Sequence, residues 1–213
     1  MIKLIILKEN NIVKYVNAEL TDTHTLLQSG RKDNKVTNEN ATVVEVSKLP
    51  EYFQVNDWTY DFKTGALSPT LEYEASILPT VKNEANNRID IETSEGLNNG
   101  FYYTVSEEQG ELFFNYTDFD RENFMDSAIV AVASLILTDA GLPTEVTWNA
   151  YKGENKELVR INLNVQQFLG LYTKGALTHK MTWMGKAGIF KERIKAASKL
   201  EEIKSILEEW SNS

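Results

Sequence analysis

Alternating apolar and polar residues predict β-structure in the first third of the chain. The apolar run over 2–7 and the following one over 12–16 flank a polar turn, which is typical of a β-hairpin. A further strand is predicted over 42–46, and a second hairpin over 58–67. These elements together predict a β-rich module over residues 1–68.

The next stretch lacks a sustained period. Residues 69–87 contain Pro69 and Pro79 among many Glu, Asn and Ser residues, so we expect a linker with a helical turn over 71–75. Beyond it, the alternation over 88–92 predicts a strand.

A hairpin followed by a helix is the clearest pattern in the second half. Two apolar runs between Gly100 and Tyr116 predict the hairpin. The helix should begin at Thr117 or Asp118 and end before Gly141, covering the aromatic surface of the hairpin. Its inward stripe is predicted from residues that recur at intervals of three and four: Met125, Ala128, Ile129, Val132, Leu135 and Ile136. Because Val130 and Leu137 lie off this stripe, we expect the helix to be buried on more than one side.

A second hairpin and two closing helices complete the pattern. The hairpin is predicted from strands over 145–151 and 157–161, with Asn162 or Asn164 as cap of the next helix. That helix should turn these residues inward: Val165, Phe168, Leu169, Tyr172, Ala176 and Met181. The last helix should bury Ile203, Ile206, Leu207 and Trp210. The predicted class is α+β, with residues 88–213 as one domain of hairpins packed with about three helices.

Composition narrows the range of functions. The chain has 213 residues, a formal net charge of −9 and no cysteine. Disulfides, thiolate metal sites and cysteine nucleophiles are therefore excluded, and the charge argues against binding to nucleic acid or anionic membranes. The apolar run over 128–137 is about half the roughly 20 residues of a membrane span. Because the N-terminal run resembles a strand more than a signal peptide, we expect a soluble protein of the cytoplasm in which it is made.

No catalytic, cofactor or metal motif is recognisable, so we predict a protein that is not an enzyme and holds no cofactor. His24 and His179 are expected in a surface turn and in a structural role on a helix, respectively. The carboxylates of Asp118–Glu122, with Asp126, have two readings. They could form a calcium loop, but a helix that starts inside the segment favours stabilisation of the helix dipole instead.

Four aromatic residues are candidates for contact with a ligand or partner. Trp58 and Tyr60 lie in a segment dense enough in rings to stack on a sugar, although a thin β module also needs large rings in its core. Trp183 and Trp210 are expected to pack between helices or onto a partner.

A series of landmarks runs through residues 88–213, roughly the last 125 of the chain: Leu112–Phe114, Phe119–Phe124, Thr147–Trp148, Leu163–Phe168 and Ile194–Ile203. Their order resembles an uncharacterised domain family found at the C-terminal end of bacteriophage tail proteins. The front of the chain is more loosely similar to short β modules that precede such domains. This chain departs from the family pattern by having fewer alanines and more glycines in its long helix.

The resemblance implies a virion or virion-assembly protein without catalytic residues. We therefore expect a structural or interaction protein of the tail-fibre or baseplate apparatus, whose partner is a fibre or baseplate protein of the same phage and which can form homo-oligomers. It would lie in the host cytoplasm during assembly and in the virion tail if structural. The alternatives are a fibre-assembly chaperone, a binding module for a host surface glycan, and an envelope-polymer hydrolase, for which no nucleophile or acid is evident.

Overall fold

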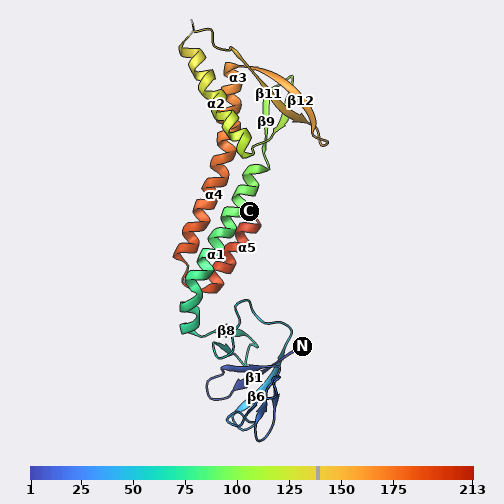
Figure 1. Ribbon diagram of the computed structural model, residues 1–213, viewed down its shortest axis with the longest axis vertical. Helices are drawn as coiled ribbons and strands as arrows, with labels where there is room; N and C mark the ends of the chain where they lie inside the picture. Colours follow the sequence, from blue (N-terminus) through green and yellow to red (C-terminus); the bar gives the residue numbers. More distant parts are fainter. Residues whose placement is uncertain (138–139) are drawn as a thin grey trace. The chain divides into compact units, whose positions relative to one another are not determined.

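The structure, a computed structural model, describes residues 1–137 and 140–213 (Figure 1). It contains both helices and strands, and its sheets have few strands each, which confirms the α+β class. The chain divides into two compact units: Met1–Val81 with Ser198–Glu201, and Lys82–Ala197 with Glu202–Ser213.

The first unit consists of small antiparallel sheets. One sheet has the order β2-β1-β6, and the opening hairpin β1–β2 and the hairpin β7–β8 confirm the two hairpins predicted here. The strands are β1 (Ile2–Leu7), β2 (Val13–Val16), β3 (Glu19–Leu20), β4 (Thr25–Leu26), β5 (Lys32–Asp33), β6 (Ala41–Val46), β7 (Trp58–Tyr60) and β8 (Leu67–Pro69).

Strand β1 is the centre of this unit because both of its faces are buried. Leu4 and Ile6 pack in one core cluster with Trp58, whereas Ile5 packs in a separate cluster on the other face. Alternation along the strand thus supplies two cores from one run of apolar residues.

Helix α1 (Leu71–Asn98) replaces both the linker expected over 69–87 and the strand expected over 88–92, so these two predictions are wrong. The Thr70 hydroxyl accepts a hydrogen bond from the Tyr73 backbone N–H at the start of the helix. The buried side of α1 is narrow and repeats every fourth residue, through Val81, Ala85, Ile89 and Thr93. The stripe is hard to recognise in the sequence because it includes the small Ala85 and the polar Thr93, and because Pro79 lies within the helix.

The second unit contains a four-stranded antiparallel sheet of order β12-β11-β10-β9. Both hairpins predicted in this region are confirmed. The strands are β9 (Phe101–Ser106), β10 (Gly110–Phe114), β11 (Glu145–Lys152) and β12 (Glu157–Asn164).

The helices of the second unit are α2 (Asp118–Ile136), α3 (Val165–Gly170), η1 (Leu171–Ala176, a π-helical turn), α4 (Leu177–Ala196) and α5 (Leu200–Ser211), together with the later part of α1. Thr117 and Asn164 cap α2 and α3 through capping boxes, as their residue types predict. Gly175 lies at a close contact, because an added Cβ there would lie 2.6 Å from the Phe101 ring. Met181, expected inward, is 72% exposed, because the inner side of α4 runs through Trp183, Ala187 and Ile194 instead.

Candidate interaction surface

Helix α2 packs on the sheet through small residues and one ring. Phe124 is fully buried, with its ring centroid 4.2 Å from that of Trp148 and 6.2 Å from that of Phe168. Ala128 and Ala131 continue the buried side at intervals of four and three. Because alanine is short, the helix lies close to its neighbours and fills its inner side without the larger residues.

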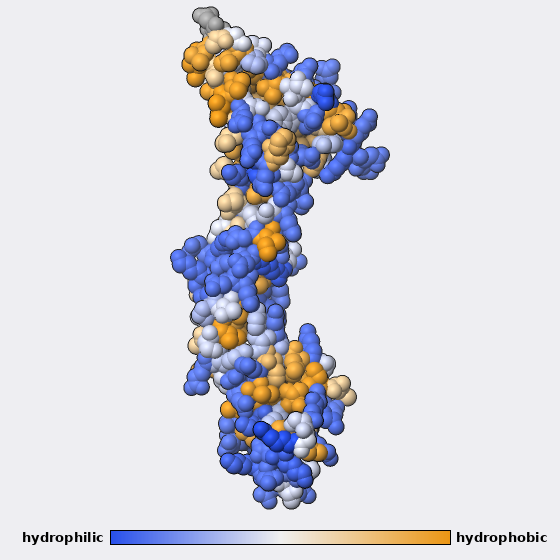
Figure 2. Space-filling view, viewed as in Figure 1, coloured by the Kyte–Doolittle hydropathy of each residue, from blue (hydrophilic) through white to orange (hydrophobic). Residues whose placement is uncertain are grey.

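The larger apolar residues of α2 point outward. The stripe predicted to face the core through Met125, Ile129, Val132, Leu135 and Ile136 is therefore wrong, with Ala128 its only buried member. The exposed fraction is 52% for Met125, 62% for Ile129 and 72% for Ile136. We define the α2 face as Met125, Ile129, Val132, Ala133, Ile136 and Leu137. Figure 2 shows apolar side chains gathered over this helix.

The α2 face borders an open groove of about 510 Å³. Ala128 and Tyr172, the latter from η1, complete its lining. The Tyr172 hydroxyl is the one side-chain hydrogen-bonding group in this lining, which leaves almost nothing to orient a polar substrate. The groove suits apolar side chains of another polypeptide.

Carboxylates lie at the N-terminal end of α2. Asp120 accepts hydrogen bonds from the backbone N–H and the hydroxyl of Thr117, and Asp118 pairs with Arg121. This arrangement agrees with the helix-dipole reading of the acidic segment. Across residues 1–137 and 140–213, no three His, Asp or Glu side chains gather as ligands for a metal ion. Glu122 and Asp126 are exposed on the side of the α2 face.

Trp58 and Tyr60, the candidates for sugar stacking, lie in the first unit. Trp58 is 5% exposed and packs on Phe53, with 5.7 Å between ring centroids. Its indole N–H has no hydrogen-bond partner among the residues described. Tyr60 is half-buried, with its ring edge to face against Phe62. A ring as buried as Trp58 has no free face on which a sugar could stack.

Trp183 and Trp210 both pack between helices of the second unit. Trp210 of α5 is 2% exposed, and its ring lies 5.3 Å from Phe190 and 6.5 Å from Trp183 of α4. Trp183 lies over Gly96 of α1, where an added Cβ would be 2.3 Å from the indole. Glycine at position 96 therefore lets α4 approach α1 closely.

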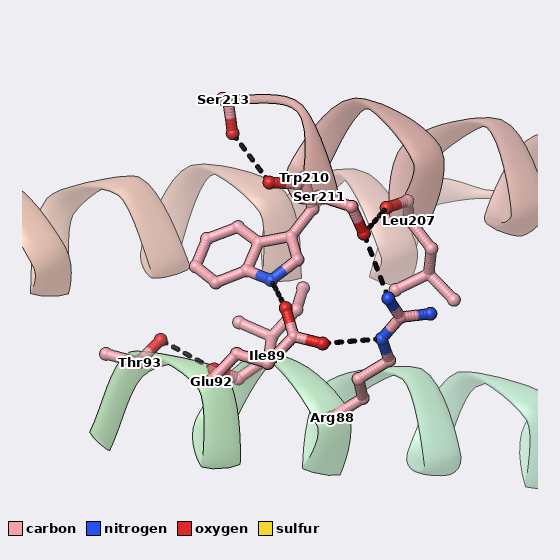
Figure 3. A network of polar contacts seen from close by, with 8 residues as sticks. All are labelled: Arg88, Ile89, Glu92, Thr93, Leu207, Trp210, Ser211 and Ser213. Carbon is pink, nitrogen blue, oxygen red and sulfur yellow. Dashed lines mark hydrogen bonds and ion pairs between the residues drawn. The ribbon is translucent and has the colours of Figure 1, made fainter. Parts of the chain in front are cut away.

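A polar network joins α5 to α1 around Trp210 (Figure 3). The Trp210 indole N–H donates to the Glu92 carboxylate, which also accepts from Arg88 Nε at 2.7 Å. Arg88 in turn donates to the Ser211 hydroxyl at 2.9 Å. The hydrogen bond from Arg88, with that from Trp210, lowers the pKa of Glu92, although partial burial opposes this shift. The network holds α5 against α1, and each of its polar side chains is hydrogen-bonded to another member.

The two histidines have partners typical of structural residues. His179 Nε2 lies 3.1 Å from the Leu97 carbonyl oxygen, and its ring packs on Phe101 and Tyr116. His24 Nδ1 lies within hydrogen-bonding distance of the Thr21 and Thr23 hydroxyls in a turn.

None of the helices in the described ranges is long and apolar enough to cross a membrane.

Comparison with known proteins identifies no relative: no family model, curated protein or solved structure matches the chain. The resemblance to phage tail domains therefore stays a prediction.

The outward face of α2 was missed because the sequence offers two apolar sides on the same helix. Residues 127–137 contain no charged side chain, and the two serines, Ser127 and Ser134, are too few to mark a solvent side. The spacing of Phe124, Ala128 and Ala131 was the available signal for the inner side, and it has a helical period of its own.

Proposed function

We propose that the protein is a non-catalytic interaction protein of the bacteriophage tail-fibre or baseplate apparatus, assembled through the α2 face. The observation that carries the proposal is this face, in which Ile129 and Ile136 are 62% and 72% exposed beside an apolar groove. The phage setting comes from the resemblance of residues 88–213 to tail-protein domains.

The burial pattern of α2 favours a protein contact over a small-molecule site. A contiguous apolar patch is unusual on a soluble monomer and marks a surface that another molecule covers. Interfaces between proteins have an apolar centre and a charged rim, and here Glu122 and Asp126 lie beside the apolar residues. A substrate site would instead need converging polar groups, and the groove offers one hydroxyl.

Co-expression with the fibre and baseplate proteins encoded nearby, followed by affinity purification, tests the proposal. We expect the wild-type chain to capture a tail protein and Ile129→Lys to lose most of that capture, because a lysine in the centre of an apolar contact must be desolvated. Ile91→Lys is the matched control, since Ile91 of α1 is exposed to nearly the same extent, 60%. Failure of the wild-type chain to capture any tail protein, together with its absence from purified particles, would refute the proposal.

Mass spectrometry of purified particles separates the structural role from the chaperone alternative. A structural component is present at a copy number that matches the fibre or baseplate symmetry. A chaperone is captured by fibre protein in lysates but is missing from mature particles.

A further inference from the structure

We propose that the α2 face is covered by helix α4 of a second copy of this chain, in a two-fold symmetric dimer. The inference rests on the proposed function: the chain would enter the tail apparatus as a dimer held together at the α2 face, and the loss of capture expected for Ile129→Lys would follow from loss of that dimer. The second copy is favoured by an exposed surface of complementary shape and charge on α4.

Helix α4 also presents apolar residues to solvent. Met181 is 72% exposed, Met184 54% and Ile189 63%, and between them lie Gly185 and Gly188. We define the α4 face as these five residues. In Figure 2, apolar residues over α2 are followed by paler patches along the helix labelled α4 in Figure 1.

The two glycines of the α4 face differ from the other helical glycines of the unit. An added Cβ would meet Trp183 at Gly96, Tyr103 at Gly170 and Phe101 at Gly175. At Gly185 and Gly188, by contrast, no described atom lies within 4 Å of that position. Glycine weakens a helix interior, and no contact within the described chain accounts for these two. They leave a shallow, flat strip that can receive the protruding side chains of another helix.

The charges beside the two faces are opposite where α4 begins, and Glu192, near the far end of the α4 face, pairs with Lys195. Glu122 and Asp126 lie beside the α2 face, and Lys174 and Lys180 are exposed on η1 and α4. None of these four side chains forms an ion pair with any residue in 1–137 or 140–213. Packing α2 on α4 of the partner brings carboxylates toward ammonium groups. Packing α2 on α2 would instead bring the carboxylates together or leave them against apolar residues.

Both faces belong to the same unit, so one two-fold operation makes the α2–α4 contact twice. The α2 and α4 faces together carry eight large apolar side chains that are between 45% and 72% exposed. A standard interface covers roughly 800 Å² on each partner and draws on about 20–30 residues. A partner that covers both helices fits this extent better than one that covers α2 alone.

Sedimentation equilibrium or light scattering of the purified full chain tests the dimer directly. We expect a dimer for the wild type and for Ile91→Lys. Ile129→Lys should be monomeric, with a dimer dissociation constant at least about tenfold higher. Circular dichroism and thermal unfolding should show that both variants fold, since both positions are exposed. A monomeric wild type across the micromolar range would overturn the inference.

A variant on α4 and a charge exchange identify the pairing. Gly188→Gln should weaken the dimer while leaving the monomer folded, because there is room for the new side chain only when no partner is present. Asp126→Lys and Lys180→Glu should each weaken the dimer, and the double variant should restore it. A dimer broken by Ile129→Lys but unaffected by Gly188→Gln, or not restored by the charge exchange, would overturn α2–α4 pairing.

The outcomes also separate this inference from the proposed function. Capture of a tail protein by a wild-type chain that stays monomeric would leave the proposed function standing and refute the dimer. A dimer that behaves as expected but captures no tail protein would support the dimer and refute the proposed function.

Discussion

Helices α5 and α2 both carry apolar stripes in the sequence, yet only one of them is covered in the structure. In α5, Ile203, Ile206 and Trp210 are each at most 6% exposed, as predicted. In α2, the predicted stripe lies outside and a second one, through Phe124, Ala128 and Ala131, lies inside. The comparison shows that periodicity reveals the spacing of an apolar stripe. Whether the stripe is buried depends instead on which elements of the fold pack against it.

Truncation of one residue from each stripe should give the largest contrast. Trp210→Ala should lower the free energy of unfolding by about 3–5 kcal/mol, because it empties a buried site and removes a hydrogen bond to Glu92. Ile136→Ala on α2 should change it by less than about 0.5 kcal/mol in the monomer. Urea unfolding followed by circular dichroism, at a concentration where the chain is monomeric, measures both. Equal losses would show that α2 is covered within the chain.

Glycine-to-alanine substitutions should have opposite effects on the free energy of unfolding at covered and at open positions of the helices. Gly96→Ala should destabilise by roughly 1–3 kcal/mol, because the new methyl group would collide with the rigid Trp183 ring. Gly188→Ala should stabilise by up to about 1 kcal/mol, because alanine favours the helix and meets no described atom. Thermal unfolding of the two variants beside the wild type, at a concentration where the chain is monomeric, is the measurement. A stabilising Gly96→Ala would contradict the close α1–α4 packing.

A subtler change isolates the polar part of α5 docking. Trp210→Phe keeps an aromatic ring in the cluster but removes the indole N–H that donates to Glu92. We expect a loss of about 1–2 kcal/mol, because Glu92 keeps its bond to Arg88 but loses one donor while partly buried. Trp183→Phe is the control, since Trp183 is half-buried and makes ring contacts in the same cluster. Urea titration should show a smaller loss for the control.

The hairpins and most helices were predictable because their signals are local, whereas the two-residue strands β3, β4 and β5 were not predicted. Hairpins follow from alternation and turn residues, and Thr117 and Asn164 cap their helices through side chains three residues from their partners. Helix α1 was not predictable in this way. Its buried stripe is only one residue wide, and its hydrogen-bonded backbone tolerates Pro79 inside an otherwise polar segment.

The candidate surface was the hardest feature to predict, because the exposure of a side chain depends on which distant segments of the chain pack over it. The exposure of Ile129 depends on which neighbours reach α2, and Ala128 and Ala131 lie on the core side because α3 and η1 come close there. The burial of Trp58 depends in the same way on contacts between distant strands. Sequence reasoning identified the apolar residues, while three-dimensional packing determined the side on which each lies.

The smallest effect concerns the pH dependence of α5 docking. The hydrogen bond from Arg88 lowers the pKa of Glu92 below its ordinary value of 4.5, so ionised Glu92 stabilises the folded state. This contribution is complete well above pH 4.5 and is lost as the pH falls through the lower pKa of the folded state. Glu92→Gln should therefore be less stable than the wild type at pH 7, and the difference should shrink below pH 4.5. Urea unfolding at pH 7 and pH 3, with the exposed Glu95→Gln as control, measures the change; a difference that does not depend on pH would show that the charge of Glu92 does not contribute to α5 docking.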